Sequence, residues 1–187
     1  MFAAFPCATW SLASAGAYRT REHIWGRPDL PPHLLRRLLL GNQTLRATIN
    51  LIKAALANHV PVVVENPATS IAWSTPGMIK LRNHIACREV VTDHCAHGAR
   101  WRKPTRLVSW HAGLAPAMLH ARCHRRGLLC SWSGLPHIVL QGKCPGSSLN
   151  WTQLAQEYPR RLATLIAAWL IGAGNAIEDS HVLSLIS

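Results

Sequence analysis

The sequence predicts an α/β fold with a mainly parallel sheet and flanking helices. Three features point to it: a continuous apolar strand at residues 60–64, helical periodicity beside it, and alternation of strand-like and helix-like segments. A strand that is apolar at every position is typical of one buried on both faces, as in a parallel sheet. With 187 residues, the chain is long enough for one domain with a hydrophobic core.

The first half of the chain predicts one strand and two helices before residue 60. A short apolar strand covers residues 2–5. A Leu-rich helix follows at 34–40, with Gly41 at its C-terminal end. Asn42 or Thr44 can cap a second helix. Its apolar residues recur three or four positions apart: Leu45, Ile49, Ile52 and Leu56.

The second half predicts three strands and two helices. The strand at 60–64 contains three consecutive valines, and a helix at 75–84 follows it. Short strands are expected around Val90-Val91 and Leu107-Val108. A long C-terminal helix should cover 151–172, with Pro159 kinking or restarting it.

We interpret the chain as a single domain, 1–187, with three parts. Residues 1–110 carry the motifs described below, 111–150 are rich in Cys, His and basic residues, and 151–187 form a C-terminal helix and tail. The apolar run at 162–176 is shorter than the ~20 residues of a membrane span and predicts a buried helix instead. Six cysteines without the spacing of a secreted disulfide framework favour a reducing, intracellular compartment.

The charge balance predicts a polyanionic partner. Twenty Lys and Arg against eight Asp and Glu give a formal charge of +12, and only 15% of residues are charged. This composition excludes a disordered polar chain or a coiled coil. Nucleic acid, most simply DNA, is the expected partner, and an anionic membrane surface is the alternative.

Two tripeptides at the ends of predicted strands carry possible chemistry: Pro6-Cys7-Ala8 and Glu65-Asn66-Pro67. Ligands of open α/β sheets sit beyond the carboxyl ends of the strands, so neighbouring parallel strands would bring Cys7 and Glu65 together. A thiolate can add to C6 of a pyrimidine while a carboxyl group protonates N3. Alternatively, Cys7 is a small buried apolar residue and Glu65 a cap or ion-pair residue.

These motifs resemble the cytosine-C5 DNA methyltransferase family. Its Pro-Cys loop resembles residues 5–11, its Glu-Asn motif residues 64–67, and a later basic motif residues 97–108. The Glu-Asn-Pro sequence followed by Ser70 and Trp73 also resembles methylase-like domains of mobile elements and viruses. The resemblance implies a Rossmann-like methyltransferase core and a cytosine that is flipped out of the duplex.

The resemblance assigns roles to several residues. Cys7 would be the nucleophile and Glu65 the acid; the residues implied to shape the substrate site are Asn66, Lys103 and Arg106. It also implies S-adenosylmethionine, whose site the family places upstream of the Pro-Cys loop. Only six residues precede Cys7, and no Gly-rich turn after a strand is visible, so a companion chain or a missing segment would supply that site.

Cysteine and histidine residues of the middle segment suggest a zinc site. Cys123, Cys130, His137 and Cys144 recur at intervals of seven and could close a tetrahedral site, although none of the pairs has the usual spacing of two to four. The alternative is that the cysteines are simply buried. A second cluster, residues 94–97, could donate one ligand or contact substrate instead.

Basic and aromatic residues are interleaved in two places, as nucleic-acid binding requires. Arg100 and Trp101 precede Lys103, and a second basic cluster contains Arg122, His124, Arg125 and Arg126 with Trp132 close behind. The alternative is a solvated basic face with buried tryptophans. Two hypotheses follow: a methyltransferase-like enzyme, or a non-catalytic, zinc-stabilised nucleic-acid-binding module.

Overall fold

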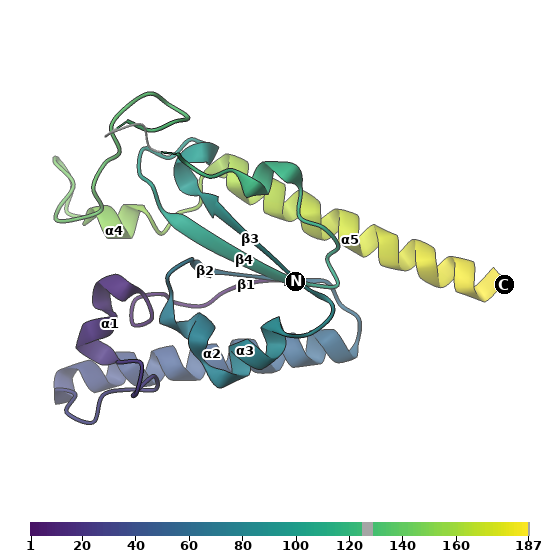
Figure 1. Cartoon of the computed structure of the whole chain (residues 1–187), viewed down its shortest axis with the longest axis horizontal. Helices are drawn as coiled ribbons and strands as arrows, with labels where there is room; N and C mark the ends of the chain where they lie inside the picture. Colours follow the sequence, from purple (N-terminus) through teal and green to yellow (C-terminus); the bar gives the residue numbers. More distant parts are fainter. Residues whose placement is uncertain (125–128, 187) are drawn as a thin grey trace.

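The computed structural model of the protein describes residues 1–124 and 129–186, without the side chains of 13, 15 and 175–186. It has a mixed α/β architecture with one open, four-stranded sheet between two layers of helices (Figure 1). The strands are β1 (Phe2–Ala4), β2 (Val62–Pro67), β3 (Cys87–Asp93) and β4 (Pro104–Trp110), in the spatial order β1-β2-β4-β3.

The expectation of a mainly parallel sheet is wrong for these strands. Strand β1 pairs in parallel with β2, but β4 is antiparallel to both β2 and β3. The physical reason is the short connection from β3 to β4, which allows a hairpin-like return, whereas a parallel pair needs a long crossover. Strands β1, β2 and β3 nevertheless run in the same direction, so their carboxyl ends share one edge of the sheet.

One face of the sheet is covered by α1 (Leu12–Tyr18), α2 (Pro32–Ala57) and α3 (Pro76–Arg82) (Figure 1). Helix α2 buries the apolar stripe that its periodicity predicts, and this stripe packs against the strands. The core of this face also contains three buried tryptophans, Trp10, Trp73 and Trp110, together with Phe5. Helix α3 confirms the helix expected at 75–84.

The two helices expected before residue 60 are one continuous helix, α2, and Gly41 does not end it. Gly41 is buried where the segment after β1 crosses the helix. The indole N–H of Trp10 donates to the Gly41 carbonyl over 3.1 Å, and a Cβ at Gly41 would lie 2.4 Å from the hydroxyl oxygen of Thr9. The glycine therefore permits a close approach of two segments instead of a helix end.

The opposite face is covered by α5 (Arg160–Ile186), which lies above the strands in Figure 1, on the side away from α2 and α3. Its buried residues Leu162, Ile166 and Trp169 pack on side chains of β2 and β4. A short helix, α4 (Trp151–Leu154), precedes Pro159, so the proline restarts the helix as expected. None of the helices in the described part of the chain combines the length and apolar character needed to span a membrane.

The segment between β4 and α4 has little regular structure. Its described residues contain one 3-10 helix, η3 (Ala117–His120), and two isolated bridges, Leu129–Pro136 and Lys143–Asn150. Another 3-10 helix, η2 (His94–His97), follows β3 directly. Cysteine and histidine side chains of both regions meet at the sheet edge, as described next.

Candidate functional site

The first candidate site lies where β1 and β2 end. Ala4 is paired with Glu65, which places the Pro6-Cys7 loop beyond the tip of β1 and next to the acid. Val62 and Val64 lie on the face of the sheet that α2 covers, whereas Glu65 shares the opposite face with Val63. The Glu65 side chain therefore points toward α5. The Cys7 thiol is half-buried there, and the negative charge of Glu65 acts on it.

The loop that carries Cys7 is held from both sides. The backbone N–H groups of Trp10 and Ser11 donate to the Cys7 carbonyl over 2.9 and 2.8 Å, which closes a tight turn. The side-chain amide of Asn66, fully buried, donates to the Phe5 carbonyl over 2.8 Å. Asn66 thus fixes the start of the loop, in the shaping role that the resemblance implies for it.

A buried arginine fastens the far end of the same loop to α2. Arg19 is 1% exposed, lies 3.4 Å above the Trp10 ring and donates to the Thr9 carbonyl over 2.9 Å. Its guanidinium also donates to Asn42 over 2.7 Å. Asn42 and Gly41 therefore hold the loop, whereas the sequence suggested helix capping. Burial lowers the pKa of Arg19 to about 10.

Glu65 is 5% exposed, and its carboxyl group lies within reach of the Tyr158 and Thr105 hydroxyl groups. The Tyr158 hydroxyl donates to Oε2 over 2.5 Å, while Oε1 is buried without a hydrogen-bond partner among the described residues. Burial raises the pKa of Glu65; the charge of Lys103 and the Tyr158 hydrogen bond oppose the rise. The acid consequently holds its proton to higher pH than an exposed glutamate.

Lys103 supplies the positive charge of this site. Its Nζ donates to the Ala155 carbonyl over 3.1 Å, and its charge acts on Cys7, Glu65 and His94. Burial raises the pKa of the Cys7 thiol, Lys103 lowers it and Glu65 raises it. The site thus combines a thiol, a carboxyl group whose pKa is raised and a fixed cation.

His94 and Tyr158 form the aromatic wall of the site. Their ring centroids lie 6.2 Å apart, and Tyr158 also meets Phe2 edge-on at 5.9 Å. Burial and the charge of Lys103 lower the pKa of His94 to about 3, so this imidazole is neutral.

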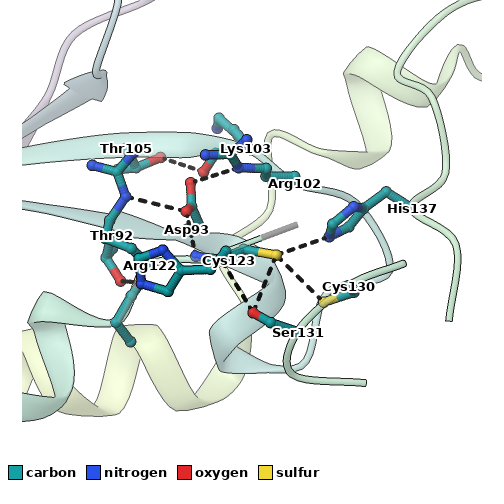
Figure 2. A network of polar contacts seen from close by, with 12 residues as sticks. Thr92, Asp93, Arg102, Lys103, Thr105, Arg122, Cys123, Cys130, Ser131 and His137 are labelled. Atoms are coloured by element: carbon teal, nitrogen blue, oxygen red, sulfur yellow. Dashed lines mark hydrogen bonds and ion pairs between the residues drawn. The ribbon is translucent and has the colours of Figure 1, made fainter. Parts of the chain in front are cut away.

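The second candidate site is a buried cluster of three cysteines and one histidine: Cys95, Cys123, Cys130 and His137. One ligand atom from each lies within 4.8 Å of all the others. Figure 2 shows the Cys123 sulfur between Cys130, 3.8 Å away, and His137 Nε2, 3.7 Å away. Tetrahedral Zn–S bonds of ~2.3 Å would place two sulfurs about 3.8 Å apart, so the cluster could hold a metal such as zinc.

Without a cation the cluster is electrostatically unfavourable. Burial raises the pKa of Cys95, and the negative charges of Cys123 and Cys130 raise it further. Burial and the neighbouring sulfurs thus oppose ionisation of Cys95, whereas at Cys130 hydrogen bonds outweigh burial and lower the pKa to about 6. A bound metal ion supplies a positive charge and deprotonates its ligands.

Asp93, at the end of β3, holds the cluster against the sheet. It is fully buried, and its Oδ2 accepts hydrogen bonds from the Cys123 backbone N–H over 2.7 Å and Arg122 Nε over 3.1 Å (Figure 2). Arg102 Nε lies 3.5 Å from Oδ1. Strand β3 thus fixes Cys123 through Asp93 and places Cys95 two residues further along η2.

Three of the four predicted metal ligands are brought together, and the fourth is not. Cys144 lies outside the cluster, and its sulfur contacts the neighbouring Pro145 carbonyl at 3.6 Å. Cys95 stands in its place, as the 94–97 cluster allowed. The even spacing of seven was misleading, because the fourth ligand comes from a 3-10 helix fixed by β3, far back in the sequence.

The remaining predicted substrate residues are dispersed. Arg106 lies on the face opposite Glu65, where it pairs with Glu89 at 3.0 Å and stacks 5.8 Å from the Trp73 ring. Arg100 is exposed and Trp101 half-buried, both in the loop after η2. Arg125 and Arg126 of the second basic cluster lie outside the described residues.

Sequence reasoning missed Tyr158 and Asp93. Tyr158 lies 93 positions from Glu65 and meets it because Pro159 starts α5 at that point. No local pattern marks this contact. Asp93 did carry a signal, as an acidic residue at the end of a strand in a chain that has few acids.

The described residues do not fit S-adenosylmethionine. None of the four strands is followed by a Gly-rich turn that could approach the cofactor. The two acids at the relevant sheet edge are already engaged, Glu65 by Tyr158 and Asp93 by two arginines and a backbone N–H. No methyl transfer can be derived from this part of the chain.

The resemblance to cytosine-C5 methyltransferases therefore rests on its short motifs and on the meeting of Cys7 with Glu65. Both motifs lie at the edge where the three like-directed strands end. No protein-family model matches the chain, and no curated protein and no solved structure is significantly similar to it.

Proposed function

We propose that this protein binds nucleic acid and adds the Cys7 thiol reversibly to C6 of an unstacked cytosine, with Glu65 as the acid. The observation that carries this proposal is the pairing of Ala4 with Glu65, which places the Cys7 loop and the acid at one sheet edge; the charge of Lys103 acts on both groups. A cysteine with an acid and a cation in the same pocket has the groups that such an addition needs. The net charge of +12 favours a polyanionic substrate.

The proposed step balances without a further reactant. The thiol releases its proton to solvent, and the sulfur forms a bond to C6. The π electrons of the C5=C6 bond shift through C4 to N3, which takes the proton of Glu65. C5 then becomes nucleophilic and takes a proton from water; loss of the original C5 hydrogen and cleavage of the S–C6 bond restore cytosine and the protonated acid.

Two features of Glu65 support its role as the acid. Its raised pKa keeps the proton on the carboxyl group to higher pH than on an exposed glutamate. Its Oε1 has no partner in the described structure, so it can face N3 while Tyr158 holds Oε2. Tyr158 thereby acts as a positioning residue for the acid.

Hydrogen exchange at C5 tests the proposal without a methyl donor. The protein is incubated in D2O with a single-stranded oligonucleotide that contains cytosine, and deuterium at C5 is followed by mass spectrometry. We expect exchange with the wild type, none with Cys7→Ala, and a rate lowered roughly a hundredfold or more with Glu65→Gln.

Cys87→Ala is the matched control, because Cys87 is also half-buried but begins β3 at the other end of the sheet. It should exchange like the wild type. Exchange that persists in Cys7→Ala, or a wild type that exchanges no C5 hydrogen, contradicts the proposed chemistry.

We also propose that the Cys95–Cys123–Cys130–His137 cluster binds zinc, which would support a nucleic-acid-binding module even if Cys7 were inert. The near-tetrahedral spacing around Cys123 favours zinc over a purely apolar role for these cysteines. Metal analysis of the purified protein should give about one zinc per chain. Cys95→Ser should lose the zinc and Cys144→Ser should retain it; the opposite pattern would restore the ligand set expected from sequence.

A further inference from the structure

Two adjoining cavities lie beside the Cys7–Glu65 site and belong to neither centre described above. The first, of about 720 Å³, opens between the loop after η2 and the start of α5, and Tyr158 forms part of its wall. The second, of about 530 Å³, opens between η2, η3 and the segment that contains Trp132. His97 and Arg161 line both cavities, so the two adjoin, and together they are called the track below.

The track is strongly basic. Arg160 and Arg161 line the first cavity and Arg122 the second, whereas Glu157 is the one acid among the residues that line them. Both arginines of α5 are exposed, and no salt bridge to either is found among the described residues. They also begin a 27-residue helix without an acidic residue in its first turn, where unpaired backbone N–H groups favour an anion.

Unpartnered polar atoms also point to a ligand. His97 is 4% exposed, and its Nδ1 has no hydrogen-bond partner in the described structure. The indole nitrogen of Trp101, which lines the first cavity, is buried and equally unpartnered. Buried polar groups normally find partners, so both cavities lack a polar occupant that would satisfy them.

Each cavity also offers an aromatic surface. Trp101 lines the first, and Trp132 lines the second with 54% of its surface exposed. The indole N–H of Trp132 donates to the Arg122 carbonyl over 3.1 Å, which fixes the ring beside a basic side chain. Tryptophan faces next to arginines are suited to stacked bases and their phosphates.

We propose that this track binds a single-stranded segment of nucleic acid, with phosphates at Arg160 and Arg161 and a base stacked on Trp132. The inference rests on the proposed function and locates the strand for it. Because Tyr158 lines the first cavity and donates to Glu65, a nucleotide there lies next to the acid. The track thus leads a strand to the Cys7–Glu65 site.

Salt-dependent binding of a fluorescent single-stranded oligonucleotide tests the track. Arg160→Gln/Arg161→Gln should weaken binding roughly tenfold at about 50 mM NaCl and reduce the slope of log affinity against log salt by about 1.4. Trp132→Ala should weaken binding roughly fivefold to a hundredfold with little change of slope. DNA and RNA of the same sequence are compared to identify the sugar.

Arg36→Gln/Arg37→Gln is a charge-matched control, since this exposed arginine pair also lies near the start of a long helix, α2, on the opposite face of the sheet. It should bind like the wild type. Equal weakening of oligonucleotide binding by the two double variants would overturn the track. So would a duplex that binds more tightly than the single strand and whose affinity is unchanged by Trp132→Ala.

The outcomes for the track and for Cys7 are separable. If the wild type exchanges the C5 hydrogen but Arg160→Gln/Arg161→Gln binds the oligonucleotide equally well, only the proposal of the track fails. If binding depends on these arginines but the wild type exchanges no C5 hydrogen, the track stands and the proposed chemistry of Cys7 fails.

Discussion

The two cysteine centres of this protein lie at one sheet edge and differ in what surrounds the sulfur. Cys7 is half-buried, with Lys103 and Glu65 acting on its thiol. Cys123 is buried, and its sulfur meets Cys130 and His137. The first setting adjusts the ionisation of one accessible thiol, whereas the second requires a cation. Surroundings, more than residue type, separate a candidate nucleophile from candidate metal ligands.

The largest expected difference between the centres is in stability. Cys123→Ser, or removal of metal by a chelator, should cost about 3–5 kcal/mol and lower Tm by roughly 10–20 °C. Cys7→Ser should change Tm by no more than about 3 °C, because the half-buried Cys7 thiol contributes less to packing than the buried Cys123 does. Thermal unfolding followed by circular dichroism measures both; equal losses would erase the distinction.

Thiol reactivity should separate the centres next. Iodoacetamide should modify the half-buried Cys7, Cys87 and Cys144 but spare the three cluster cysteines until a chelator is added. Because burial raises the pKa of Cys7 above its usual 9.0, its rate should climb about tenfold per pH unit from pH ~7 to ~9 without a plateau. Peptide mapping by mass spectrometry follows each site. Early modification of Cys123 would argue against a bound metal.

The charges around Cys7 should then tune its rate in opposite directions. Glu65→Gln removes a group that raises the Cys7 pKa, so alkylation at pH ~8 should accelerate, by roughly threefold. Lys103→Met removes the charge that lowers the pKa and should slow it by a similar factor. Arg100→Met is the charge control for Lys103. If both site variants react at the wild-type rate, the charges of Glu65 and Lys103 do not affect the pKa of Cys7.

The smallest effect is the pH dependence of the Glu65 contribution to stability. The folded-state pKa of Glu65 is raised, so its favourable contribution is complete below the unfolded value of about 4.5 and is lost as pH rises through the folded value. Glu65→Gln, which can still accept from Tyr158, should gain stability relative to the wild type at pH ~8 and lose that gain below pH ~4.5. Urea unfolding at the two pH values measures this difference in stability. A variant that is stabilised relative to the wild type at low pH would contradict a raised pKa of Glu65.

Local patterns were sufficient to predict several elements and parts of both sites. The valine run predicted β2, Pro159 predicted the restart that begins α5, and the strand ends of Cys7 and Glu65 predicted their meeting. Each of these depends on residues close in sequence or on the simple geometry of neighbouring strands. The residues that determine these features therefore lie within a few sequence positions of the features themselves.

The remaining features depend on contacts between distant segments. Gly41 suggested a helix end, but its role is set by Trp10 and Thr9 packing across α2. The place of β4 between β2 and β3 follows from sheet pairing, which no short pattern encodes. Cys95 replaces Cys144 for the same reason: the tertiary fold sets ligand distance, and sequence spacing does not.

The position of β4 has a consequence for the thiol chemistry of the protein. Cys7 follows β1 and Cys95 follows β3, at opposite ends of the strand order. Three interstrand spacings of ~4.8 Å separate those strands by roughly 14 Å, far beyond the length of a coordination bond or a disulfide. The order of the strands therefore does not favour a disulfide between Cys7 and Cys95, and Cys7 lies outside the group of four residues that could hold a metal.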